Sequence, residues 1–297
     1  MRKQVKTSLL DISYEENGSE NSPPIILLHG FPDDAKTWNS VSNSLVKDGY
    51  RTLAPYQRGY GDTVFRSETT IRSAQYSALV NDLVEFTDAL RLDKFLLVGH
   101  DWGSTVAFQM AALYPERIKG LVTLATSYNG AEQQQLSLNL TRAYWYQWFF
   151  NTEHGIRSLR EERESFCHYL WKVWSPGWNF TADSFGATAA SWDNPDFVDI
   201  VIHSYRYRWK NAKGDPGYEK LEKQLKEKPQ IEIPVIFLQG DKDGASLPES
   251  SLNKERFFTS HYERRLVMDA GHFIQREKPE QVIQAIKDII AMTGYNI

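Results

Sequence analysis

The segment Gly99-His100-Asp101-Trp102-Gly103 places a carboxylate between two glycines, each two residues away. This spacing is typical of a tight strand-to-helix turn that exposes a nucleophile, because bulkier neighbours would collide with the strand and the helix. The N-terminus of the following helix would favour negative charge at this position. We therefore predict that Asp101 is a catalytic nucleophile. The alternative is an aspartate that only caps the helix.

Two other segments that follow predicted strands carry side chains able to assist Asp101. Asp243 lies shortly after a predicted strand at 235–238, and His272 follows another predicted strand. We expect His272 to act as a general base, and Asp243 to orient it and stabilise its positive charge. Asp241 is the alternative acid, but the spacing from the strand end favours Asp243.

The segment His29-Gly30-Phe31-Pro32 follows the first buried strand. An oxyanion that forms during acyl chemistry needs hydrogen-bond donors. These are commonly the backbone N–H groups of such a loop and of the residue after the nucleophile. We assign them to Phe31 and Trp102. The residues expected to line the substrate pocket are Pro32, Trp148 and Phe273.

The elements that must position these side chains alternate between strand and helix. Short, continuous apolar runs are typical of strands that are buried on both faces. Such alternation predicts the α/β class, with a mainly parallel sheet and helices on both faces. The predicted strands are 24–30, 51–55, 95–99, 118–125, 234–238 and 264–268, and the predicted helices are 36–48, 71–90, 104–114 and 278–292.

The alternation breaks within residues 131–225, which show helical spacing, no clear strand and seven of the nine tryptophans. We predict that this block is a helical cap domain inserted into a core formed by 1–130 and 226–297. Ligands of open α/β sheets bind beyond the carboxyl ends of the strands, so a cap inserted there would cover the site. Its aromatic composition predicts an apolar or aromatic substrate.

The bulk composition is that of an ordinary globular protein, with 41% hydrophobic and 24% charged residues. The net charge is −4 and no basic stripe is present, which argues against a nucleic-acid partner. The apolar runs are too short to cross a membrane, and the N-terminus has no secretory pattern. The single cysteine, Cys167, excludes an intramolecular disulfide and a cysteine-based metal cluster. We expect a cytoplasmic protein in which Cys167 is buried.

Together these segments resemble the epoxide hydrolase and haloalkane dehalogenase branch of the α/β-hydrolase superfamily, over nearly the whole chain. The order of nucleophile, acid and histidine is that of the superfamily. The His-Gly-Phe-Pro and Gly-His-Asp-Trp-Gly motifs are shared widely in the branch, whereas Arg58-Gly59-Tyr60-Gly61 resembles epoxide hydrolases more specifically. The resemblance implies an α/β-hydrolase fold with a helical cap.

The resemblance to epoxide hydrolases also implies two cap tyrosines that hold the epoxide oxygen. Tyr205, before Trp209, matches the second tyrosine motif, and Tyr146 matches the first. The first match departs from the family because its Pro-Gly is missing, and Tyr144 is a neighbouring alternative. Simple packing within the cap is the alternative role for either tyrosine.

An aspartate nucleophile indicates attack on a saturated carbon. With an ester substrate Asp101 would form an anhydride, so plain esterase activity is not expected. Attack on an epoxide would give an alkyl ester of Asp101, while tyrosine hydroxyls assist the departing alkoxide. Water activated by His272 would then release a vicinal diol. This reaction needs no metal and no organic cofactor, and its partner would be a small apolar or aromatic epoxide.

Three alternatives stay open. Haloalkane dehalogenation would use the same Asp101, with the indole N–H of Trp102 as a halide donor, although Phe31 has no side-chain donor. Fluoroacetate dehalogenases share His-Gly-Phe-Pro but usually carry arginine after the nucleophile, where this chain has Trp102. A non-catalytic small-molecule-binding protein is the third, and the complete triad counts against it. A homodimer is compatible with the sequence, whereas membrane and nucleic-acid partners are not expected.

Overall fold

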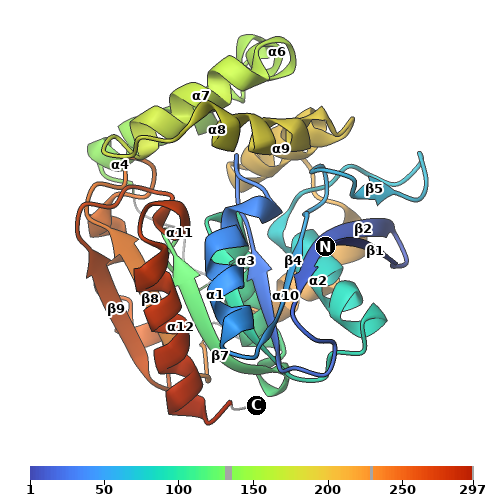
Figure 1. The fold of residues 1–297 in the computed structure, drawn as a ribbon. Helices are drawn as coiled ribbons and strands as arrows, with labels where there is room; N and C mark the ends of the chain where they lie inside the picture. Colours follow the sequence, from blue (N-terminus) through green and yellow to red (C-terminus); the bar gives the residue numbers. More distant parts are fainter. Residues whose placement is uncertain (131–135, 228–229, 296–297) are drawn as a thin grey trace.

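The computed structural model describes residues 1–130, 136–227 and 230–295, and in it a nine-stranded sheet runs through the centre of the molecule (Figure 1). The strand order is β1-β2-β4-β3-β6-β7-β8-β9, and β5 pairs with β2. From β4 to β9 all neighbours are parallel, whereas β2 pairs antiparallel with β1, β4 and β5. The strands are β1 (Arg2–Lys6), β2 (Leu10–Asn17), β3 (Pro24–Leu28), β4 (Arg51–Pro55), β5 (Val64–Phe65), β6 (Phe95–His100), β7 (Ile118–Leu124), β8 (Val235–Gly240) and β9 (Tyr262–Val267).

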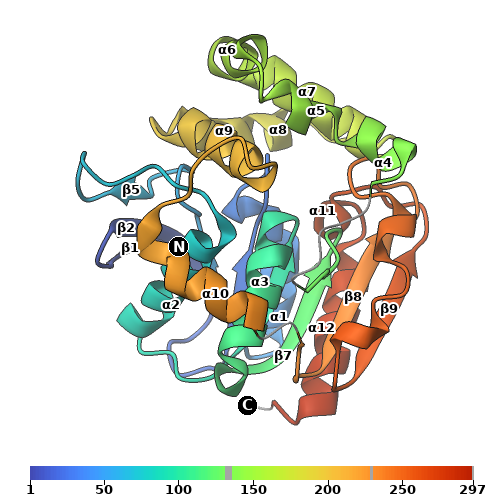
Figure 2. The same cartoon turned by 180° about the vertical axis from the view of Figure 1, so that it is seen from behind.

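Helices cover both faces of the sheet. Helices α1, α11 and α12 lie on one face, and α2, α3 and α10 lie on the other (Figures 1 and 2). Because successive strand residues point to opposite faces, Ile25 and Leu27 pack in the cluster with α1 and α12, whereas Ile26 and Leu28 pack with α2 and α3. These helices are α1 (Asn39–Lys47), α2 (Tyr76–Ala89), α3 (Trp102–Leu113), α10 (Glu219–Glu227), α11 (Ile274–Glu277) and α12 (Pro279–Thr293).

A second group of helices lies beyond one end of the sheet, above the core in Figure 1. Aromatic contacts join it to the core: the ring of Trp171 lies 5.2 Å from that of Phe273. The last helix before β8, α10, instead runs back along α3 (Figure 2). The group comprises α4 (Leu138–Ala143), α5 (Trp145–Phe149), α6 (Glu153–Glu161), α7 (Arg163–Trp174), α8 (Ala182–Ala189) and α9 (Phe197–Arg208). The 3₁₀ turns of the chain are η1 (Ala35–Trp38), η2 (Pro115–Arg117), η3 (Ala190–Asp193), η4 (Pro216–Tyr218), η5 (Pro248–Ser251) and η6 (Glu255–Phe257).

The predicted α/β class with a mainly parallel sheet is confirmed, but the sequence reasoning missed the antiparallel strands at one edge. In β1 only Val5 is a large apolar residue, and this strand is held by pairing with β2, where Val5 lies opposite Ile12. The signal that could have found β2 is the alternation of Leu10, Ile12 and Tyr14, all of which are buried.

The predicted helix at 71–90 begins later than expected, at Tyr76. The backbone groups just before it are bonded to distant partners. The carbonyl of Ser73 accepts a hydrogen bond from Arg58 (2.6 Å), and the N–H of Ala74 donates to Nδ1 of His203 (3.0 Å). These tertiary bonds replace the intrahelical ones, so the periodic pattern overestimates the helix.

The structure also bears on membrane-spanning segments and on the single cysteine. No described helix has both the length and the apolar character needed to cross a membrane. Cys167 is fully buried, as predicted.

Candidate active site

Asp101 sits between β6 and α3 with a positive φ of 53°, a conformation that side chains other than glycine rarely adopt. The flanking glycines have no room for a side chain. A Cβ on Gly99 would lie 2.3 Å from the carbonyl oxygen of Gly103, and a Cβ on Gly103 would lie 2.3 Å from that of Leu28. The tight turn that the two glycines predict is therefore present, and Asp101 is at its apex.

One oxygen of the Asp101 carboxylate is held by the backbone of the neighbouring loop. Oδ1 accepts a hydrogen bond from the N–H of Phe31 at 2.9 Å. Burial alone would raise the pKa of Asp101, but the neighbouring His272 and the N–H of Trp102 outweigh it and lower the pKa below the usual range. A Cβ on Gly30 would lie 2.4 Å from Oδ1, so this loop must carry glycine to approach the carboxylate. Asp101 is thus an anion with one oxygen held.

His272 lies between two carboxylates. Its Nδ1 is 3.0 Å from Oδ2 of Asp243, and its Nε2 is 3.6 Å from Oδ2 of Asp101. Burial disfavours the charged imidazolium, but Asp243 and Asp101 outweigh burial and raise the pKa of His272. Nε2 makes no hydrogen bond to any described residue, which leaves it available to a water molecule near Asp101.

Asp243, and not Asp241, contacts the histidine. The side chain of Asp243 is fully buried, and its Oδ1 accepts hydrogen bonds from the N–H groups of Ala245 and Ser246, both at 2.8 Å. Asp241 accepts from the N–H of Ala270 at 3.2 Å. The chain order and strand-end spacing of Asp101, Asp243 and His272 therefore bring these three side chains together.

The two predicted cap tyrosines lie side by side over the turn, with ring centroids 5.3 Å apart. The hydroxyl of Tyr205 on α9 accepts a hydrogen bond from the indole Nε1 of Trp102 at 3.1 Å. The hydroxyl of Tyr146 on α5 accepts from Nε2 of Gln147 at 2.9 Å. Both phenols are buried, and burial raises the pKa of each. Because each oxygen accepts a bond, each retains its own proton for donation.

A cavity of about 260 Å³, partly open to solvent, reaches Asp101. Tyr144 and Tyr146 both line it, as do Gln147 and Arg208. Hydroxyl, amide and guanidinium groups contribute to its wall, so it is more polar than the aromatic composition of 131–225 predicts.

The three residues predicted for the pocket are not among those that line this cavity. The carbonyl of Pro32 accepts a hydrogen bond from Nε1 of Trp192 at 2.9 Å. Trp148 packs on Trp209, with ring centroids 4.2 Å apart. Phe273 is fully buried beside His272. All three are engaged in packing between neighbouring elements.

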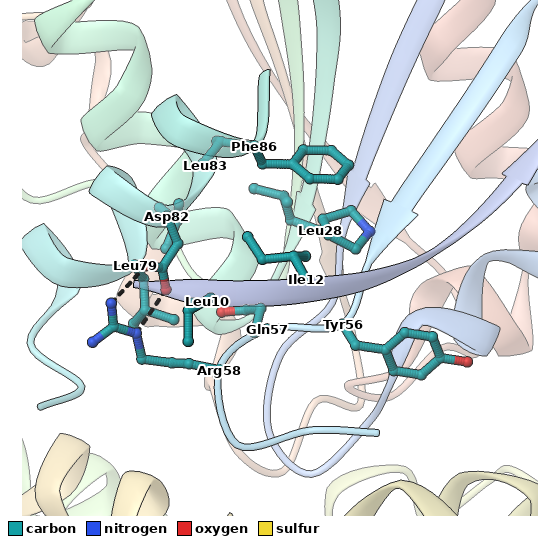
Figure 3. Close-up of a pocket in the computed structure, with 12 residues that line it drawn as sticks. Leu10, Ile12, Leu28, Tyr56, Gln57, Arg58, Leu79, Asp82, Leu83 and Phe86 are labelled. Atoms are coloured by element: carbon teal, nitrogen blue, oxygen red, sulfur yellow. Dashed lines mark hydrogen bonds and ion pairs between the residues drawn. The ribbon is translucent and has the colours of Figure 1, made fainter. Parts of the chain in front are cut away.

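The loop Arg58-Gly59-Tyr60-Gly61 has a structural role. Arg58 is buried, and its guanidinium forms two hydrogen bonds of 2.6 Å to the carboxylate of Asp82 on α2 (Figure 3). The ion pair borders a small cavity of about 30 Å³ with a largely apolar wall, and Asp101 does not line it. Tyr60 packs against His29 at 4.8 Å between ring centroids. The motif therefore fixes the loops beside the site, while Arg58 makes no contact with the triad.

The sequence reasoning missed Arg208 and Gln147. Arg208, in the last turn of α9, donates from Nη1 to Oε1 of Gln147 at 3.3 Å and from Nη2 to the hydroxyl of Tyr76. The available signal was its position three residues after Tyr205, which places both on one helix face. Within the described ranges, no group of three or more His, Cys, Asp or Glu side chains is arranged to hold a metal ion.

Comparison with known proteins identifies similar sequences and structures. Residues 23–279 match the family model described as alpha/beta hydrolase fold. A crystal structure of a putative epoxide hydrolase from Klebsiella pneumoniae is 36% identical and superposes with a TM-score of 0.91, over 97% of this chain and 96% of that one. Epoxide hydrolase 3 of Siraitia grosvenorii is 28% identical, over 90% of this chain and 92% of its own.

Bifunctional epoxide hydrolase 2 of Mus musculus is 26% identical over 93% of this chain, which corresponds to 52% of the mouse protein. The chain therefore spans about half the length of that relative. These matches confirm the resemblance to epoxide hydrolases that the motifs predict.

Proposed function

Because the chain belongs to the α/β-hydrolase fold family, we propose that it hydrolyses epoxides to vicinal diols through a covalent ester on Asp101. The observation that carries the proposal is the set of groups that surround the carboxylate of Asp101. Asp101 has a backbone N–H on one oxygen, His272 next to the other, and two cap tyrosines above it. Relatives named epoxide hydrolase that cover most of the chain support the same activity.

In the first step, Oδ2 of Asp101 attacks an epoxide carbon. A carbon–oxygen bond to the carboxylate forms and a carbon–oxygen bond of the ring breaks. The departing alkoxide takes a proton from Tyr205 or Tyr146, whose hydroxyls keep a proton for donation. A general acid in this position typically contributes about 10²–10⁴-fold to the rate.

In the second step, the ester on Asp101 is hydrolysed. Once Asp101 is esterified it has no charge, so one cause of the raised pKa of His272 is removed. His272 can then give its proton to the tyrosinate. This transfer restores the phenol and leaves His272 as a neutral imidazole, which can act as a base. His272 takes a proton from water, and the resulting hydroxide attacks the ester carbonyl. The N–H groups of Phe31 and Trp102 stabilise the oxyanion. When the acyl carbon–oxygen bond breaks, the leaving alkoxide takes the proton of the added hydroxyl, so that the diol and the Asp101 carboxylate form and His272 stays protonated, as at the start.

Haloalkane dehalogenation is less well supported by the surroundings of Trp102. That reaction needs the indole N–H as a halide donor, whereas Nε1 of Trp102 is 3.1 Å from the hydroxyl of Tyr205. Phe31 offers no side-chain donor nearby. Trp102 instead holds the phenol of Tyr205 in place. A phenol can protonate an alkoxide leaving group, which an epoxide produces and an alkyl halide does not.

We further propose that helices α4 to α9, within the block predicted as a cap at 131–225, act as the cap over this site. The cap supplies both tyrosines, and the core supplies Asp101, Asp243 and His272. Helix α10, which begins at Glu219 and lies along α3, would mark the return of the chain to the core.

The deciding experiment traps the ester. The variant His272→Gln is incubated with styrene oxide, digested and analysed by mass spectrometry. We expect the peptide that contains Asp101 to gain the mass of one epoxide, because ring opening proceeds while ester hydrolysis stops. His154→Gln, a change on α6 outside the triad, is the matched control and should turn over without accumulating ester.

Two outcomes would contradict the proposal. The first is an unlabelled Asp101 in His272→Gln when the wild-type chain demonstrably forms diol. The second is halide release from bromoalkanes by the wild-type chain without any diol from epoxides. Absence of turnover together with binding of intact small molecules would favour a non-catalytic protein.

A further inference from the structure

Arg208 is the cationic side chain among the described residues that line the cavity reaching Asp101. Among the described residues that line it, Asp101 and Arg208 are the charged ones, and the others are neutral. Arg208 closes the last turn of α9, three residues after Tyr205. An apolar epoxide would have no use for a guanidinium in this position.

The hydrogen bonds and ring contacts of Arg208 are all with neutral groups, and the charge of Asp101 acts on it only through space. Arg208 donates to Oε1 of Gln147 at 3.3 Å and to the hydroxyl of Tyr76, and its guanidinium lies 5.2 Å from the ring centre of Tyr205. No carboxylate in the described part of the chain forms an ion pair with it. Other inward-facing arginines are paired, such as Arg58 with Asp82 at 2.6 Å. Arg208 is only half-buried, and a guanidinium has five donors, so Arg208 retains donors for a ligand.

The charge balance of the site also permits an anionic ligand. Asp101 and Asp243 carry the negative charges, and a protonated His272 together with Arg208 carries the positive ones. An incoming carboxylate therefore meets a site that is neutral as a whole. Without Arg208 the same site would be negative and would repel an anion that approached the nucleophile.

On these grounds, and provided that the proposed epoxide hydrolysis is correct, we propose that Arg208 binds the carboxylate of a short epoxy acid. A guanidinium and a carboxylate match as a planar, bidentate pair. The cavity, about 260 Å³, is smaller than the roughly 300–1,000 Å³ of typical ligand pockets. A chain of a few carbon atoms between the epoxide and the carboxylate therefore fits it best.

The test compares two epoxides that differ only in charge, glycidate (oxirane-2-carboxylate) and glycidamide. We expect Arg208→Gln to lower kcat/KM for glycidate by about 100-fold, mainly through KM, because a charge-assisted bidentate bond is lost. For glycidamide the change should stay within about threefold. Arg208→Lys should restore part of the activity on glycidate.

Arg206→Gln is the matched control. Arg206 lies on the same helix but donates from Nε to the carbonyl of Phe150 at 3.2 Å and does not line the cavity. It should leave both substrates unchanged. If Arg208→Gln slowed glycidate and glycidamide equally, Arg208 would only position the tyrosines and the proposal would be overturned.

A binding measurement separates this inference from the proposed function. Glycerate, the diol that glycidate would yield, and neutral glyceramide are titrated calorimetrically into the wild-type chain and Arg208→Gln. Binding of glycerate that Arg208→Gln abolishes supports the carboxylate site even if no epoxide is opened. A wild-type chain that opens neutral epoxides but binds neither glycerate nor glycidate contradicts the Arg208 proposal and leaves the proposed function standing.

Discussion

Asp101 and Asp243 are the same residue type beside one imidazole, and their surroundings separate their roles. The carboxylate of Asp243 is buried. It accepts hydrogen bonds from two backbone N–H groups and faces Nδ1 of His272. Asp101 has one oxygen held by Phe31, and its side chain lines the cavity. A carboxylate with no free approach can only orient and stabilise, whereas one that borders a cavity can attack a bound molecule.

Changing Asp243 to Asn tests this division at the level of single residues. We expect kcat to fall by about a thousand-fold or more, because an amide beside Nδ1 can enforce the wrong tautomer and no longer stabilises the imidazolium. The ester on Asp101 should accumulate, since hydrolysis needs the base more than ring opening does. Steady-state kinetics and intact-protein mass measure the two effects.

The control for this change is Asp241→Asn, which alters the neighbouring acid that bonds to the backbone of Ala270. It should keep kcat within about threefold of the wild type. Equal losses in both variants would mean that Asp243 is not the residue that orients His272.

The grouping of Asp101, Asp243 and His272 could be predicted because all three follow predicted strands in a set order, and chain order constrains where strand ends meet. The sequence could not locate Arg208, because an arginine on a helix is usually solvated, and its direction depends on how α9 packs. The same limit explains Pro32, Trp148 and Phe273. Their apolar character was visible in the sequence, but whether an apolar side chain faces a cavity or a neighbouring helix is decided by packing.

At the scale of elements, the turn between β6 and α3 depends on close backbone contacts. The buried strands were predictable, because a strand covered on both faces must be apolar throughout. The edge strand β1 was not, since solvent on one side permits polar residues, and its pairing with β2 is a long-range property. The start of α2 was displaced for a related reason, because Arg58 and His203 bind the backbone ahead of it.

Two glycine substitutions should have opposite effects on stability. Gly103→Ala puts a Cβ 2.3 Å from the carbonyl oxygen of Leu28, so we expect the free energy of unfolding to fall by about 3 kcal/mol. Gly186→Ala, within α8, meets no atom within 4 Å and should raise it by up to ~1 kcal/mol through helix propensity. Urea unfolding measures both. Equal stability of Gly103→Ala and the wild type would contradict this prediction, because it would show that the turn can accommodate a Cβ at residue 103.

At the scale of the whole molecule, a buried charge cluster joins helix α8 of the proposed cap to the core. Arg276 of α11 forms an ion pair with Asp33 and donates to the hydroxyl of Thr188 on α8 at 2.9 Å. Asp34 lies next to this pair, and its Oδ2 has no hydrogen-bond partner in the described part of the chain. Burial, together with the charge of Asp33, raises the pKa of Asp34 to about 7.

This cluster predicts a pH-dependent stability. An aspartate in the unfolded chain titrates near pH ~3.9, so between about pH 4 and 7 the folded state binds more protons at Asp34. Stability is therefore lost as the pH rises through this window. Asp34→Asn removes the loss and keeps an acceptor for the N–H of Lys36. We expect the variant to match the wild type near pH 4 and to exceed it at pH 8 by on the order of a few kcal/mol, as measured by urea unfolding.

The neighbouring Asp33→Asn is the control. It leaves the guanidinium of Arg276 without its main partner, so it should lower stability at pH 8. A difference between Asp34→Asn and the wild type that is the same at pH 4 and pH 8 would contradict a raised pKa for Asp34.

The hydrogen bond from the indole of Trp102 on α3 to the hydroxyl of Tyr205 on α9 joins the core to the proposed cap. Any outward swing of α9 large enough to admit a molecule would break this bond and carry the phenol away from Asp101. An open molecule would then hold a nucleophile with only one of its two proton donors, Tyr146 on α5. Return of α9 after substrate entry would bring Tyr205 back over Asp101, so an epoxide would meet both proton donors only once the closed arrangement had formed again.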